Sequence, residues 1–278
     1  MKSFFIVLLS LASLPGYPGE PPSLVDVAYR AGVPEPKLDF YAAESKGFPT
    51  VVHVYGSGWR SGSGKSSAPV AEALRRHGVG CVLVSHRLAP AHSIREQAGD
   101  VAAAFAWAKA HVAEKGGDPK KIFLSGHSTG GQLVLLVVTE PTFLGAEHLS
   151  TDDVAGVVSL SAPVDLVPRA DGHGYGNIMS SARGKGVFPT DIDEITKLSP
   201  LHQLNVKIPR TLLLVGSDDF PMLAADARHF AEKAKALGTD ISTEVSPGKD
   251  HMGMVRALTN EADPVFLRVL AFIQAQPK

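Results

Sequence analysis

The sequence predicts an α/β protein with a mainly parallel central sheet flanked by helices. Short apolar runs rich in β-branched residues alternate along the chain with longer segments of helical periodicity, which is typical of βαβ units. The apolar runs are nearly continuous, as is usual for strands that are buried on both faces. No Pro- or Ser-rich linker divides the 278 residues, so we expect one domain over residues 26–278.

Six apolar runs are expected to form the strands of this sheet: residues 50–54, 81–85, 122–125, 154–160, 211–215 and 241–245. Between them lie segments with helical spacing of apolar residues that end at glycine, so we expect helices over residues 68–77, 98–114 and 221–237. Asp263 followed by Pro264 predicts the start of a last helix, because aspartate is a good N-cap and proline suits the first helical position.

Residues 165–205 differ from the rest of the chain. They are rich in Gly, Pro, Ser and charged residues and contain no long periodic run. An insertion of this kind above the carboxyl edge of a sheet would form a lid that faces the substrate, whereas the same composition also suits a mobile surface loop. The sequence leaves both interpretations open, and we expect a small cap or none.

The N-terminus carries a pattern typical of export. Lys2 precedes the apolar run 3–12, which ends in the small-x-small sequence Ser10-Leu11-Ala12. We therefore expect a signal peptide over residues 1–12 and a secreted or periplasmic protein. The alternative is a frayed apolar N-terminus on a cytoplasmic protein. The run is shorter than the roughly 20 residues that span a bilayer, so stable membrane insertion is not expected.

Composition excludes several classes of function. The formal net charge is −1 and the basic residues are scattered, which is unlike the basic patch of a nucleic-acid-binding protein. Cys81 is the only cysteine and lies in an apolar run, so we expect an inert core residue. No spacing of His, Cys or carboxylate residues is typical of a metal site, and neither a metal nor a cofactor is expected.

The most informative motif is Gly126-His127-Ser128-Thr129-Gly130, which lies between a strand-like run and a helix-like run. In this context G-x-S-x-G predicts a nucleophile elbow, a sharp turn that holds the serine in a strained conformation with its hydroxyl exposed. The strand and the helix pass close together there, so the residues two before and two after the serine must be small. Gly126 and Gly130 meet this requirement, and Ser128 is the predicted nucleophile.

A serine nucleophile needs a base and a carboxylate that orients the base. In folds with this elbow the chain order is Ser, then Asp or Glu, then His. Asp218 and Asp219 follow the expected strand 211–215, and either could be the acid, with the other capping the next helix. Of the eleven histidines, His251 alone follows these carboxylates in an expected loop, and it is the predicted base.

Acyl transfer also needs N–H donors aimed at the developing oxyanion. The amide of Thr129, which follows the nucleophile, should supply one of them. The glycine-rich loop after residues 50–54 should supply the others, and the amides of Ser57 and Gly58 are the candidates. A rival reading of this region is a phosphate-binding loop at Gly62-Ser-Gly-Lys-Ser66, but Trp59 stands where that motif needs its first glycine.

These motifs together resemble the alpha/beta-hydrolase superfamily, specifically the esterase/lipase branch with bacterial carboxylesterases and kynurenine formamidase-like enzymes. Residues 37–41 resemble its L-D-x-Y strand, and residues 85–90 resemble its Y-R-L-A-P turn. The match is close over the elbow, residues 117–131, and over the terminal histidine segment, residues 248–251. Residues 216–219 resemble the family's G-x-x-D, which favours Asp219 over Asp218 as the acid.

The oxyanion loop, residues 54–59, resembles the family's H-G-G-G-W but departs from it. Tyr55 stands in place of histidine, and Ser57 replaces the middle glycine. The Ser57 amide can still donate, whereas Tyr55 is expected to change how the loop is held. His86 replaces the usual tyrosine of the Y-R-L-A-P turn, which we expect to be a structural change.

The resemblance implies hydrolysis of carboxylic esters by Ser128, His251 and Asp219 through an acyl-enzyme, without a cofactor. We expect a small-molecule ester with a short acyl or an aryl group, since no extended apolar lid is evident in the sequence. Two alternatives remain. One is an arylformamidase-type amide hydrolase of the kynurenine formamidase kind that uses the same residues. The other is a non-catalytic binding protein with the same fold.

Overall fold

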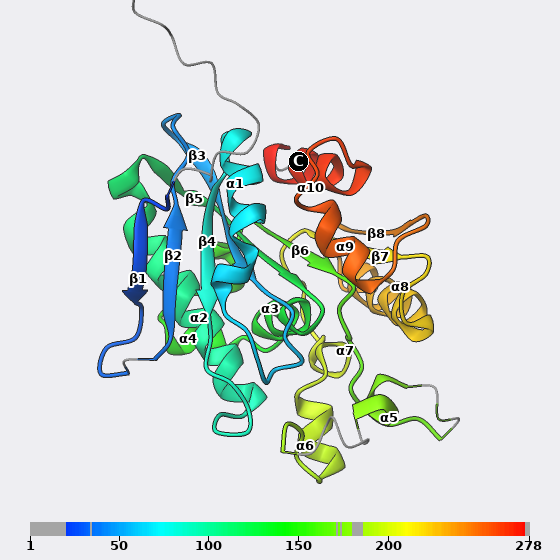
Figure 1. Ribbon diagram of the computed structural model, residues 1–278. Coiled ribbons are helices and arrows are strands. Elements are labelled where there is room, and N and C mark those ends of the chain that lie inside the picture. The colour runs from blue at the N-terminus through cyan, green and yellow to red at the C-terminus, as the bar shows by residue number, and fades with distance from the viewer. Residues whose placement is uncertain (1–20, 34, 171, 173, 180–185, 276–278) are drawn as a thin grey trace, which may run out of the picture.

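The computed structural model describes residues 21–33, 35–170, 172, 174–179 and 186–275 (Figure 1). The expected signal peptide, residues 1–12, lies outside the described residues. The centre of the molecule is an eight-stranded sheet in the order β1-β2-β4-β3-β5-β6-β7-β8. Its strands are β1 (Leu24–Ala28), β2 (Lys37–Tyr41), β3 (Phe48–Val54), β4 (Gly80–Ser85), β5 (Gly117–His127), β6 (Gly156–Leu160), β7 (Thr211–Gly216) and β8 (Ile241–Ser246).

All pairs from β4 to β8 are parallel, and only β1 with β2 and β2 with β4 are antiparallel. This confirms the predicted α/β class with a mainly parallel sheet. The central strands β3, β6 and β7 are buried along nearly their whole length, as are residues 122–127 of β5, which explains the continuous apolar runs there.

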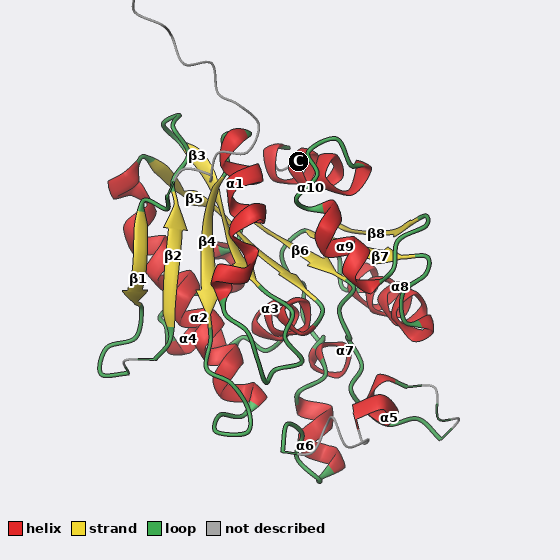
Figure 2. Cartoon of the chain, viewed as in Figure 1, coloured by secondary structure: helices red, strands yellow, loops and turns green. Residues whose placement is uncertain are grey.

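Helices cover both faces of the sheet (Figure 2). The main helices are α1 (Ala68–Arg76), α2 (Ile94–His111), α3 (Thr129–Thr139), α8 (Pro221–Ala236), α9 (His251–Ala257) and α10 (Pro264–Gln274). Apolar residues of α2, α3 and α8 form one core cluster, and those of α1, α9 and α10 form a second cluster on the other face. Among the described residues, no helix is long and apolar enough to cross a membrane.

Several short elements complete the chain: α4 (Thr142–Ala146), α5 (Tyr175–Met179), α6 (Ile192–Lys197), α7 (Pro200–Gln203) and the 3-10 helices η1 (Gly64–Ser67), η2 (Val112–Lys115) and η3 (Thr151–Asp153). Segment 165–205 holds α5, α6 and α7, which lie below the sheet at the lower right of Figure 1. Its described part is packed rather than loose, since Tyr175, Leu198 and Leu201 are buried. No long helix forms in its described part, as the absence of periodicity predicts.

The boundaries differ from the sequence-based expectation in places with a local cause. The helix expected at residue 98 begins at Ile94, because Ser93 and Glu96 form a capping box that starts it earlier. The strand expected over 122–125 extends over Gly117–His127 and pairs with β3 on one side and β6 on the other. The antiparallel strand β1 was not expected, since it is short and partly exposed and Asp26 interrupts its apolar residues.

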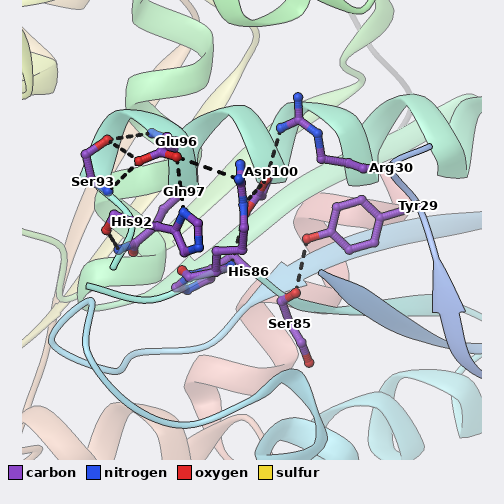
Figure 3. Close-up of polar contacts among 10 residues, drawn as sticks. Tyr29, Arg30, Ser85, His86, His92, Ser93, Glu96, Gln97 and Asp100 are labelled. Carbon is purple, nitrogen blue, oxygen red and sulfur yellow. Dashed lines mark hydrogen bonds and ion pairs between the residues drawn. The ribbon is translucent and has the colours of Figure 1, made fainter. Parts of the chain in front are cut away.

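A buried ion cluster ties the sheet to α2. Asp100 is fully enclosed and accepts hydrogen bonds from the Arg87 backbone amide at 3.0 Å, from Arg87 Nη2 at 2.8 Å and from Arg30 Nη1 at 3.0 Å. Figure 3 shows Arg30 and Asp100 on one side of this network, and beside them the Tyr29 hydroxyl on the carbonyl of Ser85 (3.1 Å). The cluster fixes the turn after β4.

We predict that Asp100→Asn lowers the free energy of unfolding by about 3 kcal/mol, because two guanidinium groups lose their buried anion. Urea denaturation checks this. Glu194→Gln is the control, since it removes a pair with Lys197 in which both side chains are half exposed, and its cost should stay below about 1 kcal/mol. Equal losses in the two variants would contradict the role given to Asp100.

Candidate active site

The elbow between β5 and α3 has the geometry that its sequence predicts. Ser128 has φ 53° and ψ −122°, in the left-handed half of the map that side chains rarely adopt. A Cβ at Gly126 would collide with the backbone of Gly130, and a Cβ at Gly130 would collide with the carbonyl oxygen of Val54. The Ser128 amide donates to the Leu160 carbonyl at 2.8 Å, which anchors the turn to β6.

Three residues that are far apart in sequence form one hydrogen-bonded chain. Ser128 Oγ lies 2.9 Å from His251 Nε2, and His251 Nδ1 lies 2.8 Å from Asp219 Oδ1. The Asp219 side chain is 1% exposed and the His251 side chain 21% exposed, so the chain runs from the interior to an open pocket. His251 is the first residue of α9 rather than part of a loop, because Asp250 caps that helix with a hydrogen bond to the Gly253 amide.

Asp219 accepts hydrogen bonds from Ser161 and Phe220 as well as from the imidazole of His251. Its Oδ2 accepts from Ser161 Oγ at 2.5 Å, and its Oδ1 also accepts from the Phe220 amide at 2.7 Å. Burial alone would raise the pKa of Asp219, but the hydrogen bonds from His251 and Ser161 outweigh it, so the pKa is lowered and the carboxylate stays charged. Sequence reasoning missed Ser161, which has φ 52° and is fully buried at the end of β6.

Asp218, the alternative acid, lies elsewhere. Its side chain is exposed and accepts from Ser217 Oγ at 2.8 Å, away from His251. The expectation that it caps the next helix is wrong, because the N-cap of α8 is Phe220, which makes no side-chain cap. The turn after β7 points Asp219 inward and Asp218 outward.

The loop after β3 faces the amide end of α3. The Ser57 amide donates to Thr129 Oγ1 at 3.0 Å, so in this structure it is engaged with a side chain. The Thr129 amide is the first of α3 and has no partner within the helix. Gly58 has φ 61°, and among the described residues its amide has no hydrogen-bond acceptor. Of the three expected oxyanion donors, the Gly58 and Thr129 amides are therefore open.

Tyr55 fixes the position of the loop after β3 through a ring stack and a hydrogen bond. Its ring stacks on His86 with centroids 5.0 Å apart and planes at 12°, and its hydroxyl donates to the Gly62 carbonyl at 3.1 Å. His86 in turn donates from Nδ1 to the Arg87 carbonyl at 2.7 Å. Tyr55 and His86, which both depart from the family's pattern, are thus in contact, and the His86 bond to Arg87 connects them to the Asp100 cluster. Figure 3 shows His86 beside that cluster.

Trp59 holds the other end of the loop. Its indole is fully buried, donates from Nε1 to Gln132 Oε1 at 3.0 Å and packs edge-on against Phe188 at 5.0 Å. Tyr175 of the 165–205 segment contacts the same indole, with ring centroids 6.3 Å apart. The described part of that segment therefore supports the loop from outside.

A pocket of about 340 Å³ opens beside Ser128. One wall is apolar and comes from α9 and the residue after it, with Met252, Val255 and Leu258. His53 of β3 and His127 of β5 also line the pocket. His127 donates from Nε2 to the His251 carbonyl at 2.9 Å, which braces the residue that contacts the serine. Within the described ranges, no three His, Cys, Asp or Glu side chains are grouped to hold a metal ion.

Comparison with known proteins agrees with this architecture. A family model described as alpha/beta hydrolase fold matches residues 51–255. The chain is 26% identical to Esterase LipC of Mycobacterium tuberculosis over 84% of this chain and 58% of that protein. It is 40% identical to Carboxylesterase NlhH of the same species, over 31% of this chain and 27% of that protein. The apo form of Thermogutta terrifontis esterase 2 superposes with a TM-score of 0.71 at 23% identity, over 94% of this chain and 99% of that one.

The curated relatives are matched over part of their length. A probable isoprenylcysteine alpha-carbonyl methylesterase of Arabidopsis thaliana is 23% identical over 78% of this chain but 48% of its own length. The chain thus spans about half the length of the curated relatives it matches. The similarity to the solved structure, at 23% identity, establishes the fold alone.

We predict that Ser161→Ala and Ser161→Gly both raise the pKa of Asp219, because each removes a hydrogen bond that favours the charged carboxylate. A ¹³C NMR titration of the Asp219 carboxyl checks this. The glycine variant should be more stable than the alanine variant by about 1 kcal/mol, since only glycine relieves the positive φ. An Asp219 pKa that is unchanged in both variants would rule out a role for the Ser161 hydroxyl.

Proposed function

The chain belongs to the alpha/beta hydrolase fold family, and from this premise we propose that it is a carboxylic ester hydrolase acting on short-acyl or aryl esters. The observation that carries the proposal is the hydrogen-bonded chain from Ser128 through His251 to Asp219, set on a strained elbow. Such a chain can activate a serine hydroxyl, which is otherwise a poor nucleophile at neutral pH.

In the proposed reaction Ser128 Oγ attacks the ester carbonyl while His251 Nε2 takes its proton. The oxygen of the tetrahedral intermediate is stabilised by the amides of Thr129 and Gly58. His251 then passes the proton to the leaving alcohol, and the acyl group stays on Ser128. Water, activated by the same imidazole, releases the acid. Asp219 keeps the imidazole in the required orientation throughout and stays ionised.

The pocket supports the choice of small substrates. A volume of about 340 Å³ is at the lower end of ligand pockets, which are typically about 300–1,000 Å³. The apolar wall of Met252, Val255 and Leu258 suits a short alkyl or an aromatic group. The arylformamidase-type alternative uses the same three residues, and no feature of the pocket favours a formamide. Amide hydrolysis and a non-catalytic binding role are therefore alternative outcomes of the kinetic test.

We predict that the wild type hydrolyses p-nitrophenyl acetate and butyrate faster than the octanoate, and that Ser128→Ala lowers kcat by about 10⁴-fold or more. Spectrophotometric release of p-nitrophenol checks this, with N-formylkynurenine as the competing substrate. Turnover of the formamide alone would favour the amide hydrolase. Equal turnover by wild type and Ser128→Ala would exclude the serine mechanism, and absence of turnover on every substrate would favour a binding protein.

Asp218 and Asp219 are adjacent, so the same substitution at each position gives a matched pair of variants. We predict that Asp219→Asn lowers kcat by about 10³–10⁴-fold, because the imidazole loses the anion that orients it. Asp218→Asn should stay within about twofold of the wild type, since its side chain is exposed and does not contact His251. Steady-state kinetics on p-nitrophenyl butyrate separates the two, and a larger loss at Asp218 would reverse the assignment.

A further inference from the structure

The pocket beside Ser128 contains two imidazoles that the proposed reaction does not use directly. His53 is 3% exposed and His127 4% exposed, and both line the pocket together with the apolar residues of α9. Polar groups in such a place normally have hydrogen-bond partners, because an unpaired nitrogen in a dry pocket loses its bond to water. Each ring has one nitrogen with a protein partner and one without.

The state of His127 follows from its contacts. Nε2 lies 2.9 Å from the His251 carbonyl, which can only accept, so Nε2 carries the proton. Burial, with the nearby His251 ring adding to it, lowers the pKa of His127 to about 3, so the ring is neutral at neutral pH. Nδ1 therefore offers a lone pair and can only accept a hydrogen bond.

Nothing in the described part of the chain donates to that Nδ1, and it is not among the fully enclosed side-chain atoms that lack a partner. A Cβ at Gly56 would lie 2.7 Å from it. The missing side chain at Gly56 thus leaves the nitrogen open to the pocket.

His53 presents a second open nitrogen. Its Nδ1 lies 3.3 Å from Ser125 Oγ, and burial lowers its pKa to about 4, so this ring is neutral as well. Across the described residues its Nε2 has no partner, and it too is absent from the enclosed, unpartnered atoms. Two neutral rings, each with one nitrogen that lacks a partner, therefore line a pocket that Met252, Val255 and Leu258 make partly apolar.

We propose that this pocket binds a hydroxyl-bearing group of the ester substrate, with His127 Nδ1 accepting its hydrogen bond and His53 Nε2 as the second polar contact. The inference rests on the proposed ester hydrolysis and names its substrate class. A hydroxyl satisfies the open nitrogens, whereas an alkyl group of the same size leaves them without water and without a partner. The hydroxyl can belong to the acyl or to the alcohol part, and the experiment separates the two.

The test uses pairs of esters that differ only by a hydroxyl in place of a methyl group. The acyl arm compares p-nitrophenyl 3-hydroxybutyrate with p-nitrophenyl 3-methylbutyrate, and the alcohol arm compares 2-hydroxyethyl butyrate with propyl butyrate. We expect the wild type to prefer the hydroxylated ester in one arm by about five- to tenfold in kcat/KM, as one hydrogen bond allows. The arm that shows the preference identifies the part of the substrate in the pocket.

Variants assign that preference to the two rings. His127→Gln keeps an amide N–H near the position of Nε2 but leaves no atom near that of Nδ1. His127→Asn keeps an amide group near the position of Nδ1 but leaves no atom near that of Nε2. We expect the preference to fall towards one in His127→Gln and to persist in His127→Asn. His53→Leu should lower the preference for the hydroxylated ester, and His53→Gln should keep that preference. Because the readout is a ratio within each variant, changes in stability or in overall rate cancel.

Two kinds of failure are distinguishable. A wild-type ratio near one in both arms, or a ratio that His127→Gln and His53→Leu leave unchanged, would overturn the hydroxyl site while leaving ester hydrolysis intact. Full turnover of all four esters by Ser128→Ala would overturn the proposed function itself.

Discussion

The site depends on one backbone constraint, the left-handed turn at Ser128. Strand β5 and helix α3 can meet at this angle only if the backbones of Gly126 and Gly130 touch and Gly130 lies against Val54. That contact brings the start of α3 beside the loop that follows β3. The serine hydroxyl and the two open amides are therefore placed by the same few atoms, and strain at Ser128 is the cost of that placement.

The turn needs support on both sides, and the support comes from residues that never reach the serine. On one side the loop is held by the Tyr55 stack on His86, which continues through Arg87 to the buried Asp100. On the other side His127 connects the elbow to the backbone of His251. Because these supports are buried, they can hold Ser128, His251 and the open amides in the arrangement that the proposed reaction requires.

Chain order and motif context predicted the α/β class, the elbow, Ser128 and His251, but they left Asp218 and Asp219 both open as the acid. The resemblance of residues 216–219 to G-x-x-D favoured Asp219, which the structure brings together with His251 and Ser128. Motifs of this kind are local, so a single sequence reveals them. The contribution of Ser161 could not be predicted, because it depends on the pairing of β6 with β7 and on a φ that serine rarely adopts. The engagement of the Ser57 amide by Thr129 was missed for the same reason, since 72 residues separate them.

Three histidines surround the pocket, and their surroundings give them different chemistry. His251 has a carboxylate on one ring nitrogen and the serine on the other, so a proton it receives has an anion beside it. His53 and His127 have no carboxylate in hydrogen-bond contact and are held neutral by burial. A neutral ring cannot compete for the serine proton, but its open nitrogen can still recognise a hydroxyl. Proton transfer and substrate recognition can thus use the same side chain type within one pocket without interfering, because burial separates the two roles.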